Sequence, residues 1–256
     1  MPNRRVTYLQ SAARATRDHR RIPFTQDPTM PTDNLPRHFI GDTRIDATLH
    51  RLYAATLRAD PPARQAALAR GLDEGAPGFY DAMKDAYLPV TPDFGMLLHL
   101  LVRTTRARMA VEFGTSFGIS TIWIAAALRA NGGGRLVTTE MNAEKADGAH
   151  RNLCEAGLDD LVEIRTGLAE HTLRRPLGGP LGFVLLDGEK SAYLPVLQLL
   201  EPDLATGAPV VADNTGMAGA RAFLDHVREP RNGYRSADLL TQALGALHPC
   251  TLLLRG

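Results

Sequence analysis

The sequence has 256 residues, 44% of them hydrophobic and 22% charged, and a formal net charge of +1. This composition fits a globular protein with one large α/β domain and excludes disordered and fibrous classes. The near-neutral charge gives no reason to expect nucleic acid or an anionic membrane as a partner, and no apolar run reaches the ~20 residues of a membrane-spanning helix. We therefore expect a cytoplasmic protein without nucleic-acid or membrane partners.

The first 40 residues differ from the rest of the chain. Residues 1–21 carry six arginines and a single acid, Asp18, with little periodic hydrophobicity. A transit peptide or an anion-binding arm would have this composition, but we favour a solvated tail or a segment lying across a partner subunit. The two cysteines, Cys154 and Cys250, are too few for a disulfide framework or a cysteine metal cluster, and we interpret both as packed thiols.

Residues 41–90 have helical patterns and predict a cap ahead of the main domain. One helix begins near Asp46, a second is expected to open at Pro61 and Pro62, and a third covers residues 79–87. In an α/β enzyme, helices placed before the sheet usually cover its open carboxyl edge. Thr91 can then cap a helix that begins the domain over residues 91–256.

Apolar strand patterns alternate with helical patterns from residue 109 onward. This spacing predicts a parallel, doubly wound α/β sheet with helices on both faces, closed by a hairpin with an antiparallel last strand. The expected strands are 109–113, 135–140, 162–165, 183–186 and 209–212, and the hairpin covers 234–240 and 251–254. The expected helices are 120–129, 143–155, 193–200 and 219–227, with a short one after residue 169.

A glycine turn follows the first strand. Gly114 and Gly118 lie between strand and helix, where backbone can approach a ligand closely. The three-glycine dinucleotide fingerprint is incomplete, and Glu112 would repel a pyrophosphate, whereas the cationic S-adenosylmethionine would tolerate it. Glu140 ends the second strand, where an acid accepts hydrogen bonds from ribose hydroxyls. A structural glycine turn and a solvated strand-end carboxylate are the alternatives, and we interpret Trp123 as a core residue.

Polar side chains also follow two later strands. Asp187 and Lys190 come after residues 183–186, and Asp213 and Asn214 follow residues 209–212. Two carboxylates and an amide are oxygen ligands suited to a hard divalent cation such as Mg²⁺, and such a cation would let Lys190 accept a hydroxyl proton. An exposed salt bridge and an Asx turn are the alternatives for these two pairs.

Together, these motifs resemble the metal-dependent class I O-methyltransferases, which include catechol and caffeoyl-coenzyme A O-methyltransferases. The resemblance covers about residues 88–255, and its specific element is the Asp187-Gly-Glu-Lys190 strand end followed by Ala212-Asp213-Asn214. It implies a seven-stranded Rossmann-like sheet, bound S-adenosylmethionine and a divalent cation.

The resemblance also implies a role for each site residue. Lys190 is the catalytic base, and Asp187, Asp213 and Asn214 are the metal ligands. The expected cofactor contacts are Glu112, Gly114, Thr115, Ser120, Glu140, Leu168, Ala169 and Asp187. Gly188 and Glu189 have no role in this scheme. Many members have an acid after the third strand, where this chain reads Gly167-Leu168-Ala169-Glu170. Catechol enzymes place an acid near the C-terminus to hold the second hydroxyl, and in this chain only Asp238 is near that position.

We therefore expect a methyltransferase that acts on a hydroxyl of a small molecule with adjacent oxygens, such as a catechol-like phenol or a secondary metabolite. We also expect a homodimer. Two alternatives remain open at this point: a metal-independent methyltransferase acting on nitrogen, carbon or another oxygen, and a non-catalytic nucleotide-binding or NAD-dependent domain.

Overall fold

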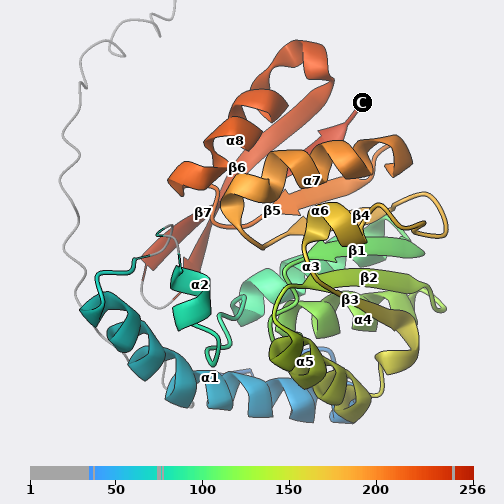
Figure 1. Cartoon of the computed structure of the whole chain (residues 1–256). Helices are drawn as coiled ribbons and strands as arrows, with labels where there is room; N and C mark the ends of the chain where they lie inside the picture. The colour runs from blue at the N-terminus through green and yellow to red at the C-terminus, as the bar shows by residue number, and fades with distance from the viewer. Residues whose placement is uncertain (1–34, 37, 74–75, 77, 244–245) are drawn as a thin grey trace, which may run out of the picture.

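The computed structural model describes residues 35–36, 38–73, 76, 78–243 and 246–256. The arginines of the predicted tail lie outside the described residues. A seven-stranded sheet runs through the molecule in the order β3-β2-β1-β4-β5-β7-β6 (Figure 1). Its strands are β1 Met109–Phe113, β2 Arg135–Glu140, β3 Val162–Thr166, β4 Phe183–Leu186, β5 Pro209–Ala212, β6 Tyr234–Ala243 and β7 Ala246–Arg255. The predicted Rossmann-like topology is confirmed, because only β7 pairs antiparallel with its neighbours.

The sheet is buried on both faces: β4 and β5 are apolar at every position, and β1 is buried at every position but its last. Ala110 and Leu185 belong to one buried cluster, whereas their strand neighbours Val111 and Val184 belong to another. The first cluster packs under α3 (Pro92–Thr104), α4 (Ile119–Ala130) and α5 (Ala143–Ala156), and the second under α6 (Ala169–Thr172), α7 (Tyr193–Leu200) and α8 (Arg221–Arg228). Figure 1 shows these two helical layers on opposite faces.

The segment before the sheet differs from the predicted three helices. A single helix, α1 (Thr43–Ala69), contains Pro61 and Pro62 in its interior, and only Phe79–Ala82 forms α2. An interior proline costs about 3 kcal/mol of helix stability. The second half of α1 packs against α2, where Ala67 is buried. The predicted helix break at Pro61 is therefore wrong. Thr91 caps α3 as predicted, accepting from Phe94 N at 3.2 Å.

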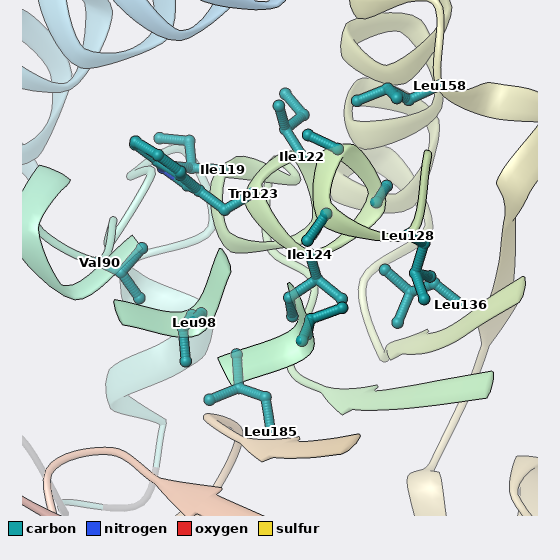
Figure 2. Packing of buried hydrophobic residues seen from close by; sticks show 14 of the residues in the cluster. Val90, Leu98, Ile119, Ile122, Trp123, Ile124, Leu128, Leu136, Leu158 and Leu185 are labelled. Carbon is teal, nitrogen blue, oxygen red and sulfur yellow. The ribbon is translucent and has the colours of Figure 1, made fainter. Parts of the chain in front are cut away.

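Trp123 of α4 contacts α1, and through Tyr53 the segment before α3, on the first face of the sheet. Figure 2 shows its side chain in the buried cluster together with Val90. Its indole Nε1 donates to the Tyr53 hydroxyl at 3.2 Å, and that hydroxyl donates to the Val90 carbonyl at 3.1 Å. The indole also meets the Phe39 ring edge to face, with centroids 5.5 Å apart. Trp123 is buried, so its interpretation as a core residue is confirmed. Among the described residues, no helix is long and apolar enough to cross a membrane.

The indole of Trp123 fits because Gly95 of α3 has no side chain. A Cβ atom at residue 95 would overlap the pyrrole ring. Alanine has a higher helix propensity than glycine by about 1 kcal/mol, but overpacking a core costs about 1–3 kcal/mol or more. We expect Gly95→Ala to lower the free energy of unfolding by about 1–3 kcal/mol, measured by urea denaturation.

Gly179→Ala is the control for this substitution, because a Cβ atom there meets nothing within 4 Å. Its effect should stay within about 0.5 kcal/mol. If Gly95→Ala were as stable as the wild type, the close contact with Trp123 would not constrain the fold.

Candidate active site

Glu112 of β1 lies at the centre of the sheet with no exposed surface. Its Oε2 accepts hydrogen bonds from the Thr121 hydroxyl of α4 at 2.6 Å and the Thr138 hydroxyl of β2 at 2.7 Å. Within the described part of the chain, its Oε1 is buried without a hydrogen-bond partner. Burial raises the pKa of this carboxyl group, and the hydroxyls of Ser120, Thr121 and Thr138 act against that shift. A buried acceptor without a partner is costly unless a ligand supplies the donor.

The glycine turn after β1 holds the acid at the end of β2. Glu140 accepts from Ser116 N at 2.8 Å through Oε2 and from Asn142 N at 2.9 Å through Oε1. Each oxygen keeps a second acceptor position, so the carboxylate can bind a hydroxyl pair as well. Thr115 is used inside the fold, because its hydroxyl lies 2.5 Å from the Thr138 hydroxyl.

Two exposed apolar side chains flank the ends of β2 and β3. Met141 follows Glu140 and is 59% exposed, and Leu168 follows Gly167 and is 51% exposed. The two strand ends are joined by a hydrogen bond of 2.9 Å from Gly167 N to the Glu140 carbonyl. Ala169 is buried in α6. Large exposed apolar side chains beside a polar strand edge are suited to a flat aromatic ligand.

The ends of β4 and β5 bring Asp187, Lys190 and Asp213 together. Lys190 Nζ lies 3.3 Å from Asp187 Oδ1, and its side chain is 4% exposed. Burial raises the pKa of Asp187 to about 8, and the Asp213 charge adds to this shift while Lys190 opposes it. Asp213 is also buried. With Asp187 ionised, the site would hold two carboxylates against one ammonium, and burial disfavours that state in the absence of a further cation.

Tyr193 and Asn214 fix the end of β5. The buried Tyr193 hydroxyl donates to the Asp213 carbonyl at 2.9 Å, and Lys190 Nζ lies 5.2 Å from the centroid of the same ring. Asn214 has a left-handed backbone with φ of 51°, and its N–H donates to Asp213 Oδ1 at 2.9 Å. Asparagine tolerates this conformation better than most residues.

Gly188 and Glu189, which the sequence left without a role, have structural ones. A Cβ atom on Gly188 would overlap the Phe113 ring. Glu189 caps the short helix η3 (Lys190–Ala192) by accepting from Ser191 N at 3.3 Å. This cap fixes the turn that carries Lys190.

The strand-end site fits a hard divalent cation by its chemistry. Within the described ranges, no group of three or more His, Cys, Asp and Glu residues could hold a metal ion. The predicted donors are two carboxylates and an amide, from Asp187, Asp213 and Asn214, an oxygen set that Mg²⁺ accepts when water and substrate complete its shell. Burial raises the pKa of Asp187, and a cation beside it would favour its ionised form.

Other residues show where sequence reasoning fell short. Met141 gave a usable signal, an apolar residue directly after the ribose acid, but was not singled out. Lys145 is buried beside the glycine turn, with Nζ 3.3 Å from the Ser116 hydroxyl, and no local pattern indicated it. Asp238 pairs with Arg228 at 2.7 Å and accepts from the Thr251 hydroxyl at 2.9 Å.

The chain matches known proteins over the same region. A family model described as a methyltransferase domain matches residues 111–215. Catechol O-methyltransferase of Mycobacterium tuberculosis is 36% identical over 165 residues, which cover 64% of this chain and 70% of that protein. Catechol O-methyltransferase of Niastella koreensis is 36% identical over 140 residues, covering 52% of this chain and 62% of that protein.

Solved structures agree with these relatives. An O-methyltransferase from Bacillus cereus, in complex with SAH, superposes with a TM-score of 0.66 at 26% identity, covering 82% of this chain and 91% of that one. The O-methyltransferase TomG from Streptomyces achromogenes, in complex with SAM, gives a TM-score of 0.60 at 30% identity, covering 80% and 94%. The chain therefore belongs to the O-methyltransferase family that includes the catechol O-methyltransferases.

Proposed function

We propose that this enzyme transfers a methyl group from S-adenosylmethionine to a hydroxyl of a small molecule with adjacent oxygens, and that it requires a divalent cation. The observation that carries the proposal is the buried cluster of Asp187, Asp213 and Lys190 at the ends of β4 and β5. These groups offer oxygen ligands and a proton acceptor in one place. Glu112, Glu140 and the glycine turn offer the donor site beside them.

The methyl donor would lie along the ends of β1, β2 and β3. The free Oε1 of Glu112 would accept the ammonium of its methionine part, with Gly114 and Ser120 nearby. Glu140 would accept the ribose hydroxyls, and Met141 and Leu168 would pack on the adenine. Ionised Asp187 and Asp213 would also favour a cationic sulfonium over its neutral product.

Lys190 would act on the acceptor hydroxyl. A divalent cation held by Asp187, Asp213 and Asn214 would lower the pKa of that hydroxyl. Lys190 would accept its proton, and the resulting oxygen would attack the sulfonium methyl carbon. The new carbon–oxygen bond forms as the carbon–sulfur bond breaks, which leaves S-adenosylhomocysteine as a neutral thioether. Asp187 would also border the donor, because its backbone N–H binds the Phe113 carbonyl next to Gly114 at 2.8 Å.

Removal of the cation tests the proposed metal site. We expect excess chelator to abolish methyl transfer to a panel of catechols and phenols, and Mg²⁺ in excess of the chelator to restore it. Asp187→Asn should lower kcat/KM by roughly 100-fold or more, because a ligand charge is lost where charge is stabilised during transfer.

Asp225→Asn makes the same chemical change on the exposed face of α8, where Asp225 pairs with Arg221, and it should keep full activity. Undiminished turnover in chelator would favour the alternative of a metal-independent methyltransferase acting on nitrogen, carbon or another oxygen.

Substitution of Glu112 tests the donor site. Glu112→Gln keeps an oxygen that can accept from Thr121 and Thr138 but removes the charge that would pair with the ammonium. Because a hydrogen bond to a charged group contributes about 1.5–3 kcal/mol, calorimetry should show roughly tenfold or greater weakening of S-adenosylhomocysteine binding.

Glu229→Gln removes a carboxylate that pairs with Arg231 beyond α8, and it should bind the ligand as the wild type does. Equal affinity of Glu112→Gln and the wild type would contradict the assigned role of Glu112.

We also propose a homodimer, a cytoplasmic location and a division of the chain at about residues 40 and 90. Light scattering on the purified full chain measures the oligomeric state directly. A monomer at micromolar concentration would contradict the dimer.

A further inference from the structure

A short segment between α2 and α3 is fastened to the main domain by buried charges. We call residues 86–88 the strap. Lys145 Nζ, from α5, donates to the Ala86 carbonyl at 2.9 Å. The Asp60 carboxylate, from α1, accepts from the two following backbone N–H groups at 2.7 and 2.8 Å. Both charged side chains are buried, with 7% and 6% exposure respectively. The strap is thus held by one cation and one anion from different helices.

Ser116 connects the strap to the glycine turn. Its hydroxyl donates to the Tyr87 carbonyl at 2.8 Å and lies 3.3 Å from Lys145 Nζ. Its backbone N–H donates to Glu140 Oε2 at 2.8 Å. A continuous chain of hydrogen bonds therefore runs from the strap, through Ser116, to the acid assigned to the ribose.

Backbone strain is concentrated at this junction. Leu88 and Ser116 both have left-handed backbones, with φ of 48° and 46°. For residues other than glycine this conformation costs about 1–2 kcal/mol. Each of the two N–H groups is bound by a carboxylate, from Asp60 and Glu140 respectively. The carboxylates thus stabilise conformations that the chain would otherwise leave.

Lys145 supplies a buried charge and a hydrogen-bond donor as well as bulk. Burial lowers its pKa, while the charges of Glu140, Asp60 and Asp85 oppose that shift. Its Nζ also lies 5.5 Å from the centroid of the Phe117 ring, the residue after Ser116. An uncharged side chain of similar length could fill the space, but it would leave the strap carbonyl without a donor.

We propose that Lys145 is a positioning residue for the methyl donor. Together with Asp60 it fixes the strap against Ser116, and this contact holds Ser116 and Glu140 in the arrangement that binds the ribose. This inference rests on the proposed function, because it needs S-adenosylmethionine at Glu140. Loss of the Lys145 contact would let the Ser116 backbone leave its left-handed conformation and would weaken donor binding. Lys190 and Asp187 would keep their arrangement.

The test compares Lys145→Met with Lys145→Arg in the full chain. Calorimetry with S-adenosylhomocysteine should show Kd raised roughly tenfold in Lys145→Met, since a charged hydrogen bond is lost. The KM for S-adenosylmethionine should rise by a similar factor, with kcat within about twofold. Lys145→Arg should restore most of the affinity. Hydrogen exchange at the strap amides should be faster in Lys145→Met than in the wild type, and it should be unchanged in Lys145→Arg. A purely structural role would not separate KM from kcat in this way.

Lys84→Met is the matched control, because Lys84 is exposed and lies just before the strap. It should bind as the wild type does. An unchanged Kd in Lys145→Met would overturn the inference while leaving the proposed function intact, provided that the wild type binds. A wild type that does not bind S-adenosylhomocysteine would overturn both. If Lys145→Met does not fold, Asp60→Asn takes its place, and unchanged affinity there would overturn the inference equally.

Discussion

The site depends on one buried carboxylate at the centre of the sheet. Burying an unpaired charge costs several kcal/mol, so Glu112 is tolerable only with its hydrogen bonds in place. Thr121 and Thr138 supply them, and these two hydroxyls tie β1 to α4 and β2. Thr115 continues the same network into the glycine turn. The groups that fix the acid therefore also fix the turn, and the remaining oxygen is left for a ligand.

Gly114 and Gly188, which follow β1 and β4, are needed for contacts inside the protein as much as for the approach of a ligand. A Cβ atom on Gly114 would lie 2.5 Å from the Asp187 carbonyl oxygen, in a backbone with φ of 104°. Gly188 lacks a side chain because the Phe113 ring occupies that space. The turn after β1 and the end of β4 are thus packed backbone to backbone. Close approach within the sheet edge accounts for these glycines, and the donor site forms beside them.

Sequence reasoning succeeded where the residues of a single strand or helix are enough to determine its structure. The apolar run 183–186 is buried on both faces, as such runs in parallel sheets are. It failed at Pro61 and Pro62, where tertiary packing overrides the helix-breaking tendency of proline. It also missed Lys145 and Asp60, because their partners are backbone groups more than 25 residues away in sequence. Periodicity and motif spacing carry no information about such contacts.

The charges at the strand ends bear on the divalent cation that we propose beside Lys190. When both aspartates are ionised, they exceed Lys190 by one negative charge, which alone would oppose formation of an oxyanion beside them. A divalent cation would balance the two carboxylates, and after proton transfer the Lys190 ammonium would balance the ionised acceptor hydroxyl. Tyr193 keeps these groups together, since its hydroxyl binds the Asp213 carbonyl and its ring faces Lys190. The residues that would hold the proposed cation would therefore also set the charge that the reacting oxygen meets.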